Sequence, residues 1–108
     1  MKEHSLGDLE EMVLLVVAAL HDEAYGVIIL EKLEDNLRRR VDISAVHVVL
    51  KRLEEKGVVR SRFGGITENR GGRRKKFYTL TAPGKMILDA RYSLRVGLYN
   101  KIPKISFG

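Results

Sequence analysis

The stretch DISAVHVVLKRLEEKG, residues 42–57, carries the clearest start and stop signals of any helix in this sequence. Asp42 or Ser44 can cap its first turn, because a short side-chain oxygen accepts a hydrogen bond from a free backbone N–H there. Gly57 can supply the left-handed residue that commonly ends a helix. The stretch therefore predicts a helix that runs through Lys56.

The two sides of this helix differ in polarity. Its apolar stripe consists of Val46, Val49, Leu50 and Leu53, and its other side carries Ser44, His47, Val48, Lys51, Arg52 and Glu55. Val48 stands out on that side, because solvation does not explain a β-branched apolar residue among polar neighbours. It can touch a thymine methyl group in a major groove, or rest against a neighbouring element.

Two further helices are predicted upstream. Residues 5–8 resemble a capping box, and apolar residues follow at helical spacing, which predicts a buried first helix. Those apolar residues are Leu9, Met12, Val13, Val16, Val17 and Leu20. After a turn at Tyr25-Gly26, the spacing of Val27, Leu30, Leu33 and Leu37 predicts an amphipathic second helix.

The segments downstream predict a hairpin and a fourth helix. Residues 58–63 and 75–80 have strand composition, with two Gly-Gly pairs between them. The cationic run RGGRRKK, residues 70–76, therefore falls on the hairpin tip and the start of the returning strand. Thr81 can cap the fourth helix, with Pro83 in its first turn, and residues 100–108 read as irregular.

The net charge of +6 is unevenly distributed along the chain. Residues 1–55 carry seven Lys and Arg against twelve Asp and Glu, whereas residues 56–76 carry eight cations against Glu68 alone. A positive face of this kind suits a protein that meets phosphate. A solvated surface with locally unmixed charge is the alternative reading, and composition does not separate the two.

Three helices followed by a two-stranded hairpin is the winged helix-turn-helix order. We therefore expect a mainly α fold with a small β-hairpin and a long C-terminal dimerisation helix. Residues 1–81 are expected to form a winged-helix DNA-binding domain, and residues 82–108 the dimerisation helix and tail, within one compact unit.

The fourth helix carries an apolar stripe that follows a core already closed by the hairpin. We expect dimerisation through Met86, Ile87, Leu94 and Leu98. Such a stripe needs another surface to cover it, and the same helix of a second copy covers it most economically. The alternative is that this helix folds back on the first one.

Double-stranded DNA is the partner that the helix and the hairpin tip predict together. Arginine binds phosphate oxygens bidentately and fits narrow minor grooves, so a glycine-rich cationic tip suits a wing. The expected recognition-helix residues are Ser44, His47, Val48, Lys51 and Arg52, and the expected wing residues are Arg70, Gly72, Arg73, Arg74 and Lys75. The cationic run alone would most often be a solvated loop.

Several motifs, in order and spacing over about residues 5 to 85, resemble the PadR family of bacterial transcriptional regulators. They are LGDLE at 6–10, AYG at 24–26, LKRLEEKG at 50–57, GRRKKFYTLT at 72–81, and Gly84. The resemblance implies a winged-helix DNA-binding domain, a C-terminal dimerisation helix and, as is usual in the family, repression of a nearby promoter. We expect the dimer to bind a pseudo-palindromic operator. The single helix after the hairpin resembles the compact subgroup of this family.

The resemblance also bears on individual positions and on ligands. The family often has tyrosine where this chain has His47, so base or phosphate contact there can differ. Some members respond to small aromatic molecules near the dimer centre. The absence of tryptophan and an aromatic content of 6% argue against a stacking site here, which leaves an effector open and without identity.

Other function classes fit the sequence less well. The chain has no cysteine, and its three histidines lie on separate elements without metal-ligand spacing, so we expect no enzyme, metal or cofactor. A winged-helix module that binds protein without specific DNA binding is the main alternative; it predicts an apolar or acidic exposed helix face. We expect no membrane contact, because the longest apolar run is short of a membrane span. The absence of cysteine fits a reducing cytoplasm, and the resemblance implies a bacterial protein.

Overall fold

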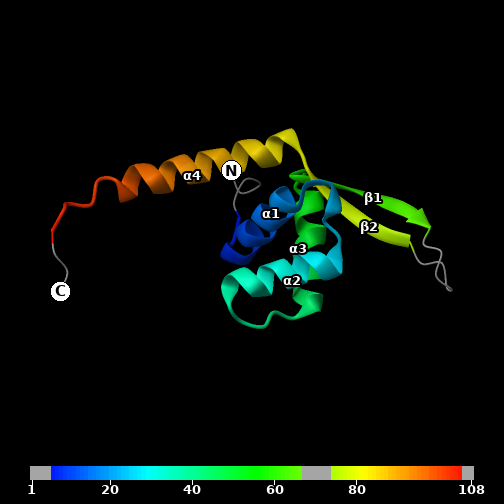
Figure 1. Cartoon of the computed structure of the whole chain (residues 1–108). Coiled ribbons are helices and arrows are strands. Elements are labelled where there is room, and N and C mark those ends of the chain that lie inside the picture. The colour runs from blue at the N-terminus through cyan, green and yellow to red at the C-terminus, as the bar shows by residue number, and fades with distance from the viewer. Residues whose placement is uncertain (1–5, 67–73, 106–108) are drawn as a thin grey trace.

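The computed structural model describes residues 6–66 and 74–105 (Figure 1), except that the side chains of residues 65, 66 and 74 are not described. Its elements are α1 (Asp8–Leu20), the 3-10 turn η2 (His21–Glu23), α2 (Gly26–Leu37), α3 (Ile43–Glu55), β1 (Val59–Ile66), β2 (Arg74–Leu80) and α4 (Ala82–Tyr99). This order confirms the predicted fold class of helices with a two-stranded hairpin. In Figure 1 the hairpin and α4 extend from the three-helix core in opposite directions.

The first helix begins at a glycine rather than at a serine cap. Gly7 is the N-cap, and its N–H donates to the Glu10 carboxylate at 3.1 Å, which is half of a capping box. Ser5, included in the predicted box, lies outside the described residues. Val13, Leu14, Val16 and Val17 are buried, so α1 forms the centre of the core.

The predicted stripe of α2 is wrong at its first position. Ile29 and Leu33 are fully buried, whereas the Val27 side chain is 57% exposed. Two apolar spacings fit this helix, and packing against α1 and α3 selects the one that includes Ile29. Arg38 ends the helix with a φ of 58°, and its N–H donates to the Glu34 carbonyl at 2.8 Å. The left-handed position here is therefore occupied by arginine.

The local signals of α3 are confirmed. The Asp42 carboxylate accepts a hydrogen bond from the Ser44 N–H at 3.1 Å, which decides between the two predicted caps. Gly57 follows the helix with a φ of 77°. All four residues of the predicted apolar stripe are buried, so the opposite side of α3 faces solvent.

The hairpin strands are longer than predicted at the tip end. They pair antiparallel from Val59 with Leu80 to Ile66 with Arg74, with an irregularity after Phe63. The far edge of β2 is also paired, because the Tyr78 N–H donates to the Ala24 carbonyl at 2.8 Å and Tyr25 bridges to Phe77. The segment before α2 thereby fixes the hairpin against the helical core.

The start of α4 is locked onto the base of the hairpin. The Thr81 hydroxyl accepts a hydrogen bond from the Gly84 N–H at 3.2 Å and donates to the Gly57 carbonyl at 2.7 Å, which confirms the predicted cap. A Cβ on Gly84 would lie 2.3 Å from the Val58 carbonyl oxygen. Only a glycine lets α4 approach the strand this closely.

Most of α4 lies outside the core. Gly84 and Leu88 are its buried residues, and the molecule measures 60 × 33 × 21 Å because the helix leads away from the body. Of the expected dimerisation residues, Met86, Leu94 and Leu98 are exposed and Ile87 is half-buried. Within the described chain, no helix has the length and apolarity that crossing a membrane requires.

Candidate nucleic-acid interface

The solvent side of α3 presents the five predicted recognition residues together. Ser44, His47, Val48, Lys51 and Arg52 are all exposed. They lie there because the opposite stripe of the helix packs into the core, so the 3.6-residue period turns these positions outward. The Val48 side chain is 49% exposed among the described residues.

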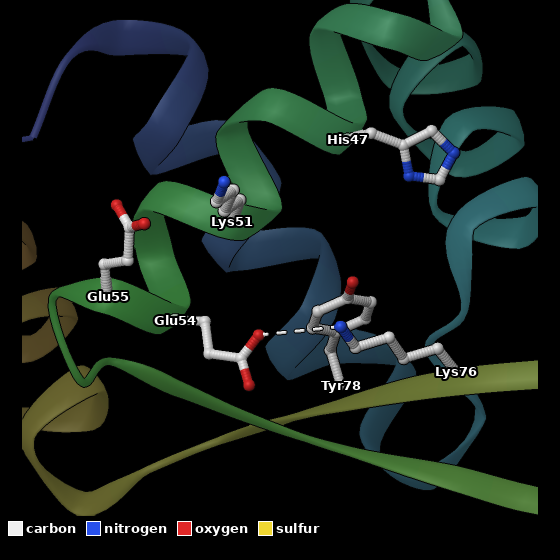
Figure 2. A pocket seen from close by; sticks show the side chains of 6 residues that line it. All are labelled: His47, Lys51, Glu54, Glu55, Lys76 and Tyr78. Atoms are coloured by element: carbon white, nitrogen blue, oxygen red, sulfur yellow. Dashed lines mark ion pairs between the residues drawn. The ribbon is translucent and has the colours of Figure 1, made fainter.

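A groove separates this helix face from the returning strand of the hairpin (Figure 2). Its volume is about 550 Å³, and its lining consists of His47, Lys51, Glu54, Glu55, Lys76 and Tyr78. Three of these residues also line a second hollow of about 500 Å³ beside the start of α2. The two hollows therefore form one continuous depression along α3 and β2, edged by cations from both elements.

Lys76 reaches across this groove towards α3. Its Nζ lies 3.9 Å from a Glu54 carboxylate oxygen (Figure 2). The Ser61 hydroxyl donates to the same carboxylate at 2.6 Å. Burial, and secondly the Glu54 charge, raises the pKa of the Tyr78 hydroxyl. Tyr78 therefore stays neutral at physiological pH and can donate a hydrogen bond into the groove.

Aromatic rings and cations alternate along the middle of the hairpin and its edge next to Tyr25. The Lys75 Nζ is 4.4 Å from the centroid of the Tyr25 ring, and the Tyr25 and Phe77 rings meet edge to face at 5.4 Å. The Arg62 guanidinium lies 4.9 Å from the centroid of Phe77. Cation–π contacts of this kind hold charged groups in place at an exposed site. Arg62 and Lys75 are thus each held against an aromatic ring.

Gly26 permits close contact between α2 and the recognition face. A Cβ at this position would lie 3.1 Å from His47 Cε1. The imidazole therefore rests against the backbone where α2 begins. Tyr25 is half-buried, and Gly26 is the first residue of α2.

Arg52 differs from the other recognition residues because it is drawn towards α1. Its Nη1 lies 3.9 Å from Glu10, and the same carboxylate accepts a hydrogen bond from Lys56 at 2.8 Å. The Lys56 hydrogen bond is the largest cause that lowers the pKa of Glu10. Glu10 is nearly buried and stays ionised, so it sets the direction of Arg52 along the edge of α3.

Comparison with known proteins identifies the relationship. Residues 13–90 match the model of the transcriptional regulator PadR-like family. The chain belongs to the PadR family. The sequence has no significant match among curated proteins.

Solved structures of similar chains share the fold. A PadR-like transcription factor from Bacteroides fragilis is 25% identical, with a TM-score of 0.69 over 87% of this chain and 85% of its own. A PadR family regulator from Clostridium difficile is 24% identical, with a TM-score of 0.68 over 87% and 93%. RosR from H. salinarum is 19% identical, with a TM-score of 0.72 over 92% and 82%.

The PadR assignment confirms the predicted family and winged-helix fold, and it confirms that the chain is a transcription regulator rather than an enzyme. Among the described residues, no three His, Asp or Glu side chains are grouped so that they could hold a metal ion.

The predicted wing of this PadR protein is only partly described. Arg70, Gly72 and Arg73 lie outside the described residues, as does the Arg74 side chain, although the Arg74 backbone begins β2. Lys75 is the one wing residue whose side chain is placed, against the Tyr25 ring.

The expected wing residues leave out two further cations of the hairpin, Lys76 and Arg62. Lys76 faces the groove, and Arg62 lies opposite Phe77 in the hairpin register. Strand alternation could have separated Lys75 from Lys76, because neighbouring residues point to opposite faces. Arg62 required the register of the hairpin, which the residues between the strands do not fix.

Proposed function

We propose that this PadR-family protein is a homodimeric repressor that binds double-stranded DNA sequence-specifically at a pseudo-palindromic operator. One observation carries the proposal: the exposed face of α3 and the lysines of β2 border the same open groove. A duplex that enters this depression meets hydrogen-bond donors from the helix on one side and cations from the hairpin on the other.

In this proposal α3 lies in the major groove. Ser44 and His47 near its start contact base edges, and Val48 packs against a thymine methyl group. Lys51 contacts a base edge or a phosphate, and Arg52 contacts a phosphate from the side next to α1. Phosphate contacts fix the register of the helix, whereas base contacts supply the specificity.

The hairpin supplies the second set of contacts. Lys75 binds the neighbouring phosphate backbone from its position on the Tyr25 ring. Arg70, Arg73 and Arg74, with Gly72 between them in the sequence, extend this contact to the backbone or to the minor groove.

The dimer is formed through α4. Met86, Leu94 and Leu98 are each more than half exposed, and an apolar surface of this kind on an extended helix marks an interaction site. Together with Ile87 they make a self-complementary contact in a two-fold dimer. Two copies of α3 then enter successive major grooves about 34 Å apart.

Fluorescence anisotropy tests the proposal. The protein is titrated with its own upstream DNA and with an unrelated duplex of equal length, at 50 and 200 mM salt. Selective binding at the higher salt supports a regulator. If the dimer neutralises about 6 to 10 phosphates, affinity falls by about 10³ to 10⁵ between the two salt concentrations.

Two variants localise the contact within the same assay. Lys51→Ala removes a cation on α3, and we expect the slope of log affinity against log salt to fall by about one unit per lost phosphate contact. Lys85→Ala is the matched control, because Lys85 is bound to Asp89 on α4 at 2.8 Å, away from the groove. Equal effects of the two variants would reject the assignment of α3, and no binding to either duplex would favour a protein-interaction module.

A further inference from the structure

Two neighbouring carboxylates at the start of α1 bind two different elements. Glu10 bonds to Lys56 and approaches Arg52 at the end of α3. Glu11 bonds to Arg91 and Arg95 in the middle of α4. Adjacent helix residues point about 100° apart, so one turn of α1 can hold both elements at once.

The contacts of Glu11 form a short, partly buried network. One Glu11 carboxylate oxygen accepts from Arg91 Nε at 3.0 Å and from Arg95 Nη2 at 3.1 Å, and Arg91 Nη2 donates to the Leu6 carbonyl at 3.3 Å. The Glu11 side chain is 13% exposed. Burial favours its neutral form, but the two arginines outweigh burial and lower the pKa of Glu11. We call Glu11, Arg91 and Arg95 the α1–α4 clamp.

The clamp lies where α4 leaves the body of the protein. Gly84 and Leu88 are buried, Arg91 and Arg95 continue the same helix face, and Leu98 further along is exposed. Residues three and four apart lie on the same side of a helix. Along this side, α4 is first buried at Leu88, then ion-paired at Arg91 and Arg95, and then exposed at Leu98. The clamp therefore extends the attachment of α4 to α1 beyond the buried Leu88.

We infer that the α1–α4 clamp sets the distance and rotation between the two recognition helices, and thereby selects the spacing of the operator half-sites. The inference rests on the proposed DNA-binding dimer. If α4 holds the two copies together, its angle to α1 decides where each α3 lies, because Glu10 and the core tie α3 to α1. Glu11 is then a positioning residue that never touches DNA.

DNA geometry makes this angle a matter of specificity. Inserting one base pair between half-sites moves them apart by about 3.4 Å and rotates them by about 35°. A rigid dimer therefore binds both half-sites at one spacing and only one half-site at the other spacings. The second half-site raises affinity by about 10² to 10⁴ when both are reached together.

The first test measures the direction of α4 without DNA. The chain has no cysteine, so Asn36→Cys on α2 and Lys101→Cys beyond α4 place two spin labels uniquely. Double electron–electron resonance, with the labelled protein diluted in unlabelled protein, gives the distance within one protomer. We expect a narrow distribution in the labelled parent and a broader or shifted one after Glu11→Gln.

Two further variants separate the clamp from general damage to the fold. Arg91→Gln with Arg95→Gln removes the clamp from the α4 side and should broaden the distribution in the same way. Asp89→Asn is the control, because it breaks an ion pair within α4 that does not reach α1. Circular dichroism of each sample in solution, before it is frozen for the distance measurement, shows whether the variant is folded.

The second test uses duplexes selected with the wild-type protein and rebuilt with spacers one or two base pairs longer or shorter. We expect the affinity of the wild type for one spacing to exceed its affinity for the others by about tenfold or more. For Glu11→Gln, the affinities for duplexes with different spacers should lie within about threefold of one another. Binding to a duplex with a single half-site should be equal for both proteins.

The outcomes are distinct. An unchanged distance distribution in both clamp variants overturns the inference. So does a broadened distribution with an unchanged spacing preference. If the wild type selects no duplex, the proposed function fails and the spacing role fails with it, while the distance measurement still shows whether the clamp orients α4.

Discussion

The winged unit and α4 use their apolar residues in opposite ways. In α3, which has 13 residues, the whole apolar stripe is buried within the chain. In α4, which has 18 residues, the apolar side chains at 86, 94 and 98 remain exposed. The winged unit is stabilised by its own core, whereas the surface of α4 is suited to a partner. Equivalent substitutions in the two regions should therefore have different consequences.

The largest expected effect is on assembly. Leu94→Glu places a charge in the proposed α4 interface, and two-fold symmetry buries it twice, at a cost of several kcal/mol per ion. We expect monomers in sedimentation velocity with an unchanged circular dichroism spectrum. Asp89→Asn is the control on the same helix. A dimer that survives Leu94→Glu would place the interface elsewhere.

The second effect is on the fold. Leu53 in α3 is fully buried, so Leu53→Ala should lower the free energy of unfolding by about 2 to 5 kcal/mol. Leu98→Ala in α4 removes the same atoms from a side chain that is 58% exposed. Urea denaturation of both variants in the Leu94→Glu background measures the protomer alone. Equal losses of unfolding free energy in the two variants would show that α4 contributes as much to the stability of the protomer as α3 does.

A third effect compares two glycines of α4. Gly84→Ala brings a methyl group against the Val58 carbonyl and should destabilise by about 1 to 3 kcal/mol. Gly97→Ala has open space around the new methyl group and should stabilise by up to about 1 kcal/mol, because alanine favours a helix. Thermal unfolding of the two variants should show shifts of opposite sign.

The smallest effect depends on pH. The pKa of Glu10 is lowered in the folded state from an ordinary value of 4.5, first by the Lys56 hydrogen bond. A lowered folded pKa gives stability that is fully present above pH 4.5 and is lost as the pH falls through the folded value. Glu10→Gln should therefore lower Tm most at neutral pH, and the difference from wild type should shrink towards pH 3.

Glu11→Gln should follow the same pH trend with a smaller loss, because burial, which favours the neutral form, is the largest single influence on the pKa of Glu11. Thermal unfolding at a series of pH values measures both variants. A larger loss for Glu11→Gln would show that α4 contributes more to the fold than the comparison implies.

What the sequence predicts well in this protein is local. The caps Asp42 and Thr81, the end of α3 at Gly57 and the buried stripe of α3 depend on residues a few positions apart. Their hydrogen bonds close within one turn, so the residues themselves identify them. Val27 shows the limit of this reasoning, because two spacings fit α2 and only its neighbours choose between them.

What the sequence does not predict is contact between distant residues. Lys56 and Glu10 are 46 residues apart, and Arg91 and Glu11 are 80 apart. Charged residues in an exposed helix usually face solvent, so nothing in the pattern marks these pairs. The Tyr25 and Phe77 rings likewise meet only because β2 pairs with the segment before α2.

The contact between Gly26 and His47 has a consequence for redesign of the DNA preference. In the proposed function, position 47 contacts base edges, yet its side chain packs against the backbone of α2. A larger residue at position 26 would displace the imidazole without itself contacting DNA. A bulkier side chain at position 47 has to fit into the space next to Gly26. Libraries that vary these two positions together will therefore recover specificities that single-site libraries miss.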